Sequence, residues 1–203
     1  MVKTNPNFGL LVENYLFADI SKRVADFTAA GGNGQRVIKM GIGDVTLPLA
    51  DAVIEAMHSA VSEMGVKETF QGYPPYDGYP FLKKAISDYY RARSIDIDPS
   101  EVYVGDGAKS DLGNITDLFS NDNIVLVPDP VYPVYVDSNL MLNREIRYLD
   151  ANESNGYLPL PDDKTVGDII YLCSPNNPTG AVYTHDQLAH WVAFAREHGS
   201  VIL

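Results

Sequence analysis

The residues best suited to chemistry stand in three short loops, and the first is "GDGAKSD" at positions 105–111. Its glycines follow a strand-like run and precede a helix-like run. The free N–H groups in the first turn of such a helix can receive an anion such as a phosphate. Because the loop lacks the G-x-G-x-x-G and G-x-x-x-x-G-K-[ST] spacings, a plain strand-to-helix turn with a solvated Lys109 stays an open alternative.

The second loop, "DPVYPVY" at 129–135, carries two tyrosines three positions apart. Its prolines restrict the backbone, so an aromatic ring there can stack on a flat heterocycle, or simply pack against the core. The third, "SPNNPTG" at 174–180, places two amides between two prolines and before a glycine. Asparagine amides donate and accept hydrogen bonds, so this loop predicts a polar contact, with structural turn chemistry as the alternative.

Short apolar strands and amphipathic helices must position these loops. Helices are predicted at about 49–64 and 79–93, near Asp111, and after Thr184, where Gln187 completes a capping box. Strands are predicted at 101–105, 123–129, 144–150, 168–173 and in the final "SVIL". This alternation indicates an α/β fold with a mostly parallel sheet covered on both faces, whose ligands gather at the carboxyl ends of the strands.

Composition and charge limit the class of partner. The 203 residues are 45% hydrophobic, which is sufficient for a packed core, and their net charge of -12 argues against a nucleic-acid partner. A signal peptide and a membrane span are not expected, so a cytoplasmic location is predicted. The single Cys173 is interpreted as a buried core thiol, and the four histidines show no metal-ligand spacing.

Six stretches in order resemble fold-type I aminotransferases that depend on pyridoxal 5'-phosphate, and within them most closely the LL-diaminopimelate aminotransferase family. They are "NYLFADI", "GIGDVTLPL", "ETFQGY", "DGAKSDLGNI", "DPVYPVYVD" and "IYLCSPNNPTGAV". The resemblance covers the whole chain and implies a three-layer α/β/α large domain, incomplete here. It divides the chain into an N-terminal arm with part of the small domain at 1–45 and the first part of the cofactor-binding domain at 46–203.

The resemblance also implies which residues hold the cofactor. The backbone at Ala108 and Lys109 would hold its phosphate, together with the hydroxyl of Tyr73 from a partner subunit. Tyr132 would stack on the pyridine ring, and Asn177 would hydrogen-bond to the phenolic oxygen.

For the substrate, the family pattern places Gly43 against the α-carboxylate of the amino acid. Tyr15 and the side chain of Lys109 would line the region around the rest of the molecule, next to Tyr132 and Asn177. A homodimer is implied because Tyr15 and Tyr73 act across a subunit boundary in this family.

Two departures from the family pattern matter. Members usually read Gly-Tyr-Gly-Pro-Glu-Gln-Gly where this chain has "GYPPYDG", so Tyr76 stands where a glutamate meets the distal ammonium of the substrate, with Asp77 beside it. The Schiff-base lysine of the family is expected beyond Leu203, so this chain carries no catalytic residue of its own and is expected to be inactive alone.

The expected reaction transfers the amino group of LL-2,6-diaminopimelate to 2-oxoglutarate, giving tetrahydrodipicolinate and glutamate in lysine biosynthesis. Two alternatives stay open: another class I/II aminotransferase with a different amino donor, and a non-catalytic fragment.

Overall fold

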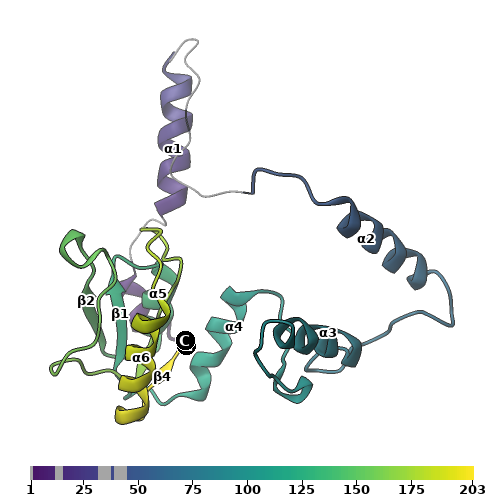
Figure 1. Ribbon diagram of the computed structural model, residues 1–203. Coiled ribbons are helices and arrows are strands. Elements are labelled where there is room, and N and C mark those ends of the chain that lie inside the picture. The colour runs from purple at the N-terminus through teal and green to yellow at the C-terminus, as the bar shows by residue number, and fades with distance from the viewer. Residues whose placement is uncertain (1, 12–15, 32–37, 39–44) are drawn as a thin grey trace. The chain divides into compact units, whose positions relative to one another are not determined.

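The computed structural model describes residues 2–11, 16–31, 38 and 45–203 (Figure 1). The chain divides into two compact units. Unit 1 consists of Met1–Val12 and Asp106–Leu203, and unit 2 of Glu13–Gly105. The domain boundary expected after residue 45 stays a prediction, since residues 39–44 lie outside the described part of the chain.

Unit 1 is built on a four-stranded sheet. Its strands are β1 (Val125–Asp129), β2 (Ile146–Asp150), β3 (Ile169–Ile170) and β4 (Val201–Ile202). Their order is β2-β1-β3-β4, and every neighbouring pair is parallel. The predicted parallel sheet is therefore confirmed, although β3 is shorter than the run at 168–173.

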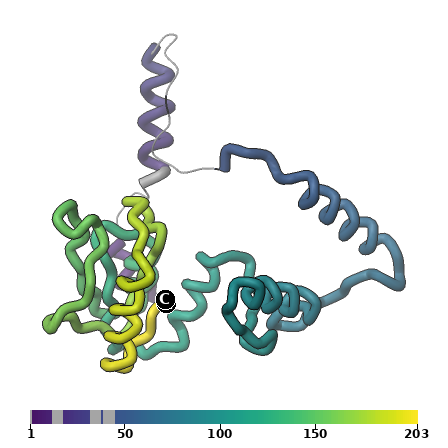
Figure 2. The backbone as a smooth tube through the Cα atoms, in the orientation of Figure 1, coloured from purple at the N-terminus to yellow at the C-terminus, as the bar shows by residue number. Residues whose placement is uncertain are grey.

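Helices cover both faces of this sheet, and Figures 1 and 2 let the chain be followed from β1 through α5 to β2. Leu126 and Ile170 pack with Trp191 of α6 (His185–His198). The alternate side chains Val125 and Val127 pack on the other face, with residues of α4 (Ala108–Ile115) and α5 (Pro133–Met141). Successive strand side chains point to opposite faces, so the apolar run "IVLV" supplies two cores at once, and the predicted three layers are confirmed.

The ends of α6 follow the predicted signals. The Gln187 amide donates to Thr184 Oγ1 at 3.3 Å, and the Thr184 amide donates to Gln187 Oε1 at 2.9 Å. Gly199 ends the helix at a φ of 70°. The capping box and the C-terminal glycine are thus confirmed.

A buried arginine ties α4 to the sheet. Arg144 is 4% exposed, and its guanidinium donates to Asn139 Oδ1 at 2.9 Å, to Thr116 O at 2.7 Å and to Phe119 O. The two carbonyls lie in the segment that follows α4, where Arg144 supplies their buried donor. It thereby fixes α4 against α5 at the start of β2.

Unit 2 contains α1 (Leu16–Ala29), α2 (Asp51–Met64) and α3 (Pro80–Arg91). Helices α2 and α3 were predicted, whereas α1 and α5 were not. No residue of α2 is buried, and the residues that α3 buries are Lys83 and Ser87. The apolar side chains of α3 stay largely open in this unit: Leu82 is 37% exposed and Tyr89 is 56% exposed.

Short 3-10 helices complete both units. They are Pro6–Leu10, Pro99–Glu101, Thr116–Leu118 and Glu153–Asn155.

Three further expectations need correction. Residues 102–105 form no strand, and Tyr103 there is 71% exposed, because no neighbouring strand among the described residues pairs with it. The helix expected near Asp111 begins three residues earlier, at Ala108. Cys173 is half-buried rather than buried, and its thiol donates to Pro175 O at 3.2 Å.

Candidate functional site

The loop at 174–180 leaves the end of β3 and folds back on itself. The Asn176 amide donates to Ala181 O at 2.8 Å, and the Gly180 amide donates to Asn176 O at 2.7 Å. Gly180 adopts a φ of 74°, which a residue with a Cβ rarely accepts. The loop is therefore held at Asn176, while the next residue, Asn177, has an exposed side chain.

Asn176 also joins this loop to the one that follows β1. Its side-chain amide donates to Pro130 O at 3.3 Å and to Thr179 Oγ1 at 3.0 Å. The residue is 7% exposed, and among the described residues its Oδ1 is the buried side-chain oxygen that lacks a hydrogen-bond partner. Because β1 and β3 are neighbours, the two predicted loops meet at the same edge of the sheet.

Tyr132 stands at this edge as the N-cap of α5, followed by Pro133 at the first helical position. Its ring lies 5.6 Å from the ring of Tyr135, which stacks on Tyr171 at 4.9 Å. Burial, and then a hydrogen bond with Cys173, raise the pKa of Tyr135 to about 12. Tyr132 is thus the half-buried end of an aromatic stack that continues through Tyr135 to the buried Tyr171.

The start of α4 supplies a different kind of group. Gly107 is its N-cap with a φ of 142°, and no side chain caps the helix there. Ala108 and Lys109 are exposed in the first turn. The N–H groups of a first turn have no partners within the helix, so this end of α4 can receive an anionic oxygen.

The remaining predicted site residues belong to unit 2. Tyr73 is fully exposed and Tyr76 is 90% exposed, whereas Asp77 pairs with the buried Lys83. Tyr15 and Gly43 lie outside the described residues. The structure therefore brings Tyr132 and the 174–180 loop together in unit 1, while Tyr73 and Tyr76 share one loop in unit 2.

Two residues with clear roles, Asn176 and Lys83, were missed from the sequence. Asn176 is identical in type to its neighbour Asn177, so composition cannot tell which of them is buried. The pair of Asp77 and Lys83 spans six positions, which is no helical spacing. Only the burial of Lys83, on the polar face of α3, reveals it.

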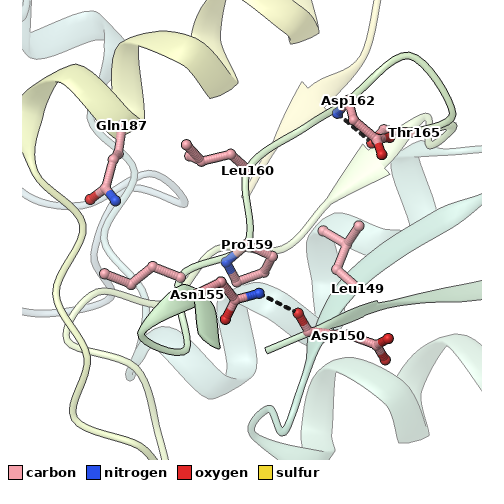
Figure 3. A pocket seen from close by; sticks show the side chains of 9 residues that line it. Leu149, Asp150, Asn155, Pro159, Leu160, Asp162, Thr165 and Gln187 are labelled. Atoms are coloured by element: carbon pink, nitrogen blue, oxygen red, sulfur yellow. Dashed lines mark hydrogen bonds between the residues drawn. The ribbon is translucent and has the colours of Figure 1, made fainter. Parts of the chain in front are cut away.

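A hollow of about 450 Å³ lies beside the end of β2 but has the features of packed turns (Figure 3). Asn155 Nδ2 donates to Asp150 O at 2.7 Å, and the Asp162 amide donates to Thr165 Oγ1 at 2.8 Å. These polar groups of the hollow are thus already hydrogen-bonded to one another. Within the described ranges there is no His, Cys, Asp and Glu cluster suited to a metal ion, and no helix there is long and apolar enough to cross a membrane.

Comparison with known proteins identifies a family. The family model described as "Aminotransferase class I and II" matches residues 35–203. The LL-diaminopimelate aminotransferase of Agathobacter rectalis is 49% identical over all of this chain and 53% of its own length. That of Parabacteroides distasonis is 48% identical over all of this chain and 52% of its own length.

Solved structures show the same likeness. The structure of the L,L-diaminopimelate aminotransferase of Chlamydomonas reinhardtii matches 99% of this chain and 52% of that one, with a TM-score of 0.86 and 34% identity. The chain thus spans about half the length of the curated relatives that it matches.

Proposed function

The chain belongs to the class I and II aminotransferases, and on that premise we propose that the protein is an LL-diaminopimelate aminotransferase. It transfers the amino group of LL-2,6-diaminopimelate to 2-oxoglutarate and yields tetrahydrodipicolinate and glutamate, a step of lysine biosynthesis. The observation that carries this proposal is the 49% identity to a relative of that name across the whole chain. The predicted fold class is confirmed as that of a fold-type I aminotransferase by the likeness to a solved relative.

The residues of unit 1 fit pyridoxal 5'-phosphate, the cofactor of this family. A phosphate suits the uncapped start of α4, an aromatic heterocycle suits Tyr132, and a phenolic oxygen suits an exposed amide such as Asn177. When bound, the cofactor supplies an electron sink that makes the Cα–H bond of an amino acid labile.

In this proposal four parts of the cofactor site have distinct tasks. The backbone of Ala108 and Lys109 binds the phosphate, and Tyr132 fixes the plane of the ring. The amide of Asn177 donates to the phenolic oxygen and so withdraws electron density from it. Tyr73 adds its hydroxyl to the phosphate from the partner subunit.

The substrate contacts and the assembly are those that the family resemblance implies. In this proposal Gly43 binds the α-carboxylate, and Tyr15, the side chain of Lys109, Tyr132 and Asn177 are contacts of the donor. We propose that the protein is a cytoplasmic homodimer, with residues 46–203 forming the first part of the cofactor-binding domain.

A second candidate is a class I/II aminotransferase with another amino donor. It is favoured by one observation: the residue at the position of the family glutamate is Tyr76, and the neighbouring Asp77 already pairs with Lys83. A carboxylate that is engaged in this way is a poor partner for a second ammonium group.

The test is to express the complete gene and to assay amino transfer to 2-oxoglutarate from LL-diaminopimelate, L-aspartate and L-phenylalanine. The proposal expects the highest kcat/KM with LL-diaminopimelate. A higher value with L-aspartate or L-phenylalanine would replace it with the second candidate.

A further inference from the structure

The loop at 72–78 is fixed at its base while its tyrosines are exposed. Tyr79 donates its hydroxyl to Gly72 O at 2.7 Å, and the Gly78 amide donates to Pro75 O at 3.0 Å. These two hydrogen bonds close the loop, and Pro74 and Pro75 restrict the backbone in its middle. Tyr73 and Tyr76 therefore project from a stiff loop rather than from a loose one.

The segment at 103–104 holds the same loop from a second side. The Val104 amide donates to Asp77 O at 3.1 Å. Gly78 adopts a φ of 107°, and a Cβ built there would lie 2.5 Å from Val104 Cγ2. The backbone thus approaches Val104 as closely as a glycine allows, and a side chain at position 78 would displace the loop.

Asp77 contributes its carboxylate to this anchoring. It pairs with the ammonium of Lys83, a residue that is 8% exposed and whose Nζ lies 5.8 Å from the centre of the Tyr103 ring. The hydrogen bond from Lys83 holds the pKa of Asp77 below its ordinary value of 3.8. At neutral pH the carboxylate is therefore ionised, and its charge is already balanced by a buried cation.

A substrate ammonium would have to compete with Lys83 for Asp77. Taking the carboxylate away would leave Lys83 buried without its partner, and an uncompensated buried charge costs far more than an exposed one. A shallow hollow of about 440 Å³ lies on the loop between Tyr73, Tyr76, Tyr79 and Leu82, and none of the described residues that line it is charged. The groups that the loop offers outward are aromatic rings and hydroxyls.

We propose that Asp77 and Lys83 are a positioning pair that sets the conformation of the 72–78 loop, and that Tyr76, not Asp77, is the loop's contact with the amino donor. This inference rests on the proposed function for the identity of the donor, since that function places the loop at the substrate. The positioning pair itself rests on the geometry of unit 2 alone.

The pair is tested by a double-mutant cycle in the complete protein, using Asp77→Asn, Lys83→Met and the double variant. Both single variants lower the melting temperature, and the double variant loses no more than the worse of the two, because each removes the same interaction. Additive losses would overturn the pairing. If Lys83→Met does not fold, Lys83→Arg keeps the charge and is expected to retain more stability than Asp77→Asn.

Donor selectivity tests the second part of the proposal, that Tyr76 and not Asp77 contacts the amino donor. Single-turnover reactions of the holoenzyme are measured with LL-diaminopimelate, which has a distal ammonium, and with L-glutamate, which has none. For Asp77→Asn the half-saturating concentrations of both donors change by the same factor, within about two-fold. A rise of about ten-fold for LL-diaminopimelate alone would show that Asp77 binds the ammonium, and would overturn the proposal.

Substitutions of Tyr76 are expected to change the donor selectivity in the same assay. Tyr76→Ala raises the half-saturating concentration of LL-diaminopimelate about ten-fold more than that of L-glutamate, and Tyr76→Phe has a smaller effect because it keeps the ring. Equal effects on both donors would refute the role of Tyr76. If the wild-type protein uses a different donor altogether, the proposed function fails, while the melting temperatures of the cycle still decide the positioning pair.

Discussion

Two proline-bearing loops, one in each unit, both place an anchored residue next to an exposed one. In the 174–180 loop Asn176 is buried and its neighbour Asn177 is exposed; in the 72–78 loop Asp77 is paired and its neighbour Tyr76 is exposed. The anchors differ, however. Asn176 is a neutral amide that bonds to Pro130 O and Thr179 Oγ1, whereas Asp77 is a charge that needs Lys83.

An exposed functional side chain can thus be held in place by either kind of neighbour. A neutral anchor gains a few hydrogen bonds and is insensitive to pH, while a charged anchor is coupled to one counter-ion and to its protonation. In both loops the residue next to the anchor is free to face a ligand. Substitutions of the exposed residue and of its anchor are therefore expected to affect different properties, activity in the first case and stability in the second.

The largest effect is expected from Asn177→Ala in the complete protein. Loss of a preorganised donor lowers kcat/KM about 100- to 1000-fold, and because the side chain is exposed, the melting temperature of the apo-protein stays within about 2 °C. Steady-state assays and thermal unfolding check this. Activity within about three-fold of wild type would remove Asn177 from the site.

A smaller effect, on stability, is expected from Asn176. Asn176→Ala loses the two hydrogen bonds that the side-chain amide donates, which costs about 1–2 kcal/mol in the free energy of unfolding. Asn176→Asp keeps the shape but buries an unpaired carboxylate, so it costs about 2 kcal/mol more at pH 7. Urea unfolding at pH 7 compares the two variants, and equal stabilities would contradict the buried anchor.

Two glycines provide a matched pair for the backbone. Gly180 has a φ of 74° and nothing within 4 Å of an added Cβ, so Gly180→Ala costs about 1 kcal/mol from strain alone. Gly78 has a φ of 107° and would also meet Val104, so Gly78→Ala costs about 2 kcal/mol or more. Chemical denaturation of both variants measures the gap, and the reverse order would contradict the close approach to Val104.

The smallest effect is a pH dependence of the charged anchor. The pKa of Asp77 is lowered in the folded protein by the hydrogen bond from Lys83. Its stabilising contribution is therefore fully present above the ordinary value of 3.8 and is lost as the pH falls through the lower folded value. Melting temperatures of wild type and Asp77→Asn converge below that window, and a constant difference down to pH 2 would contradict it.

The sequence predicts the scaffold well where local chemistry decides. Thr184 with Gln187 marks the start of α6, Gly199 marks its end, and the run "IVLV" predicts a strand buried on both faces. Pro133 at the first turn of α5 is a start signal that would have located that helix too. These features depend on neighbouring residues, so a single sequence contains them.

The features that the sequence does not predict depend on contacts with residues far away in the chain. The run at 101–105 has strand composition but no strand beside it among the described residues, and α2 is amphipathic with no buried side chain. Amphipathicity predicts a helix, not what covers it. Likewise Asn176 and Asn177 are indistinguishable in the sequence, because Pro130, which selects the first as the anchor, lies 46 positions away.

The most direct test is a crystal structure of the complete protein with pyridoxal 5'-phosphate and LL-diaminopimelate bound. In that structure we expect Asn177 to donate to the phenolic oxygen while Asn176 stays bonded to Pro130 O, and Tyr76 to contact the donor while Asp77 stays paired with Lys83. Asp77 turned away from Lys83 toward the distal ammonium, or Asn176 in place of Asn177 at the ring, would contradict it.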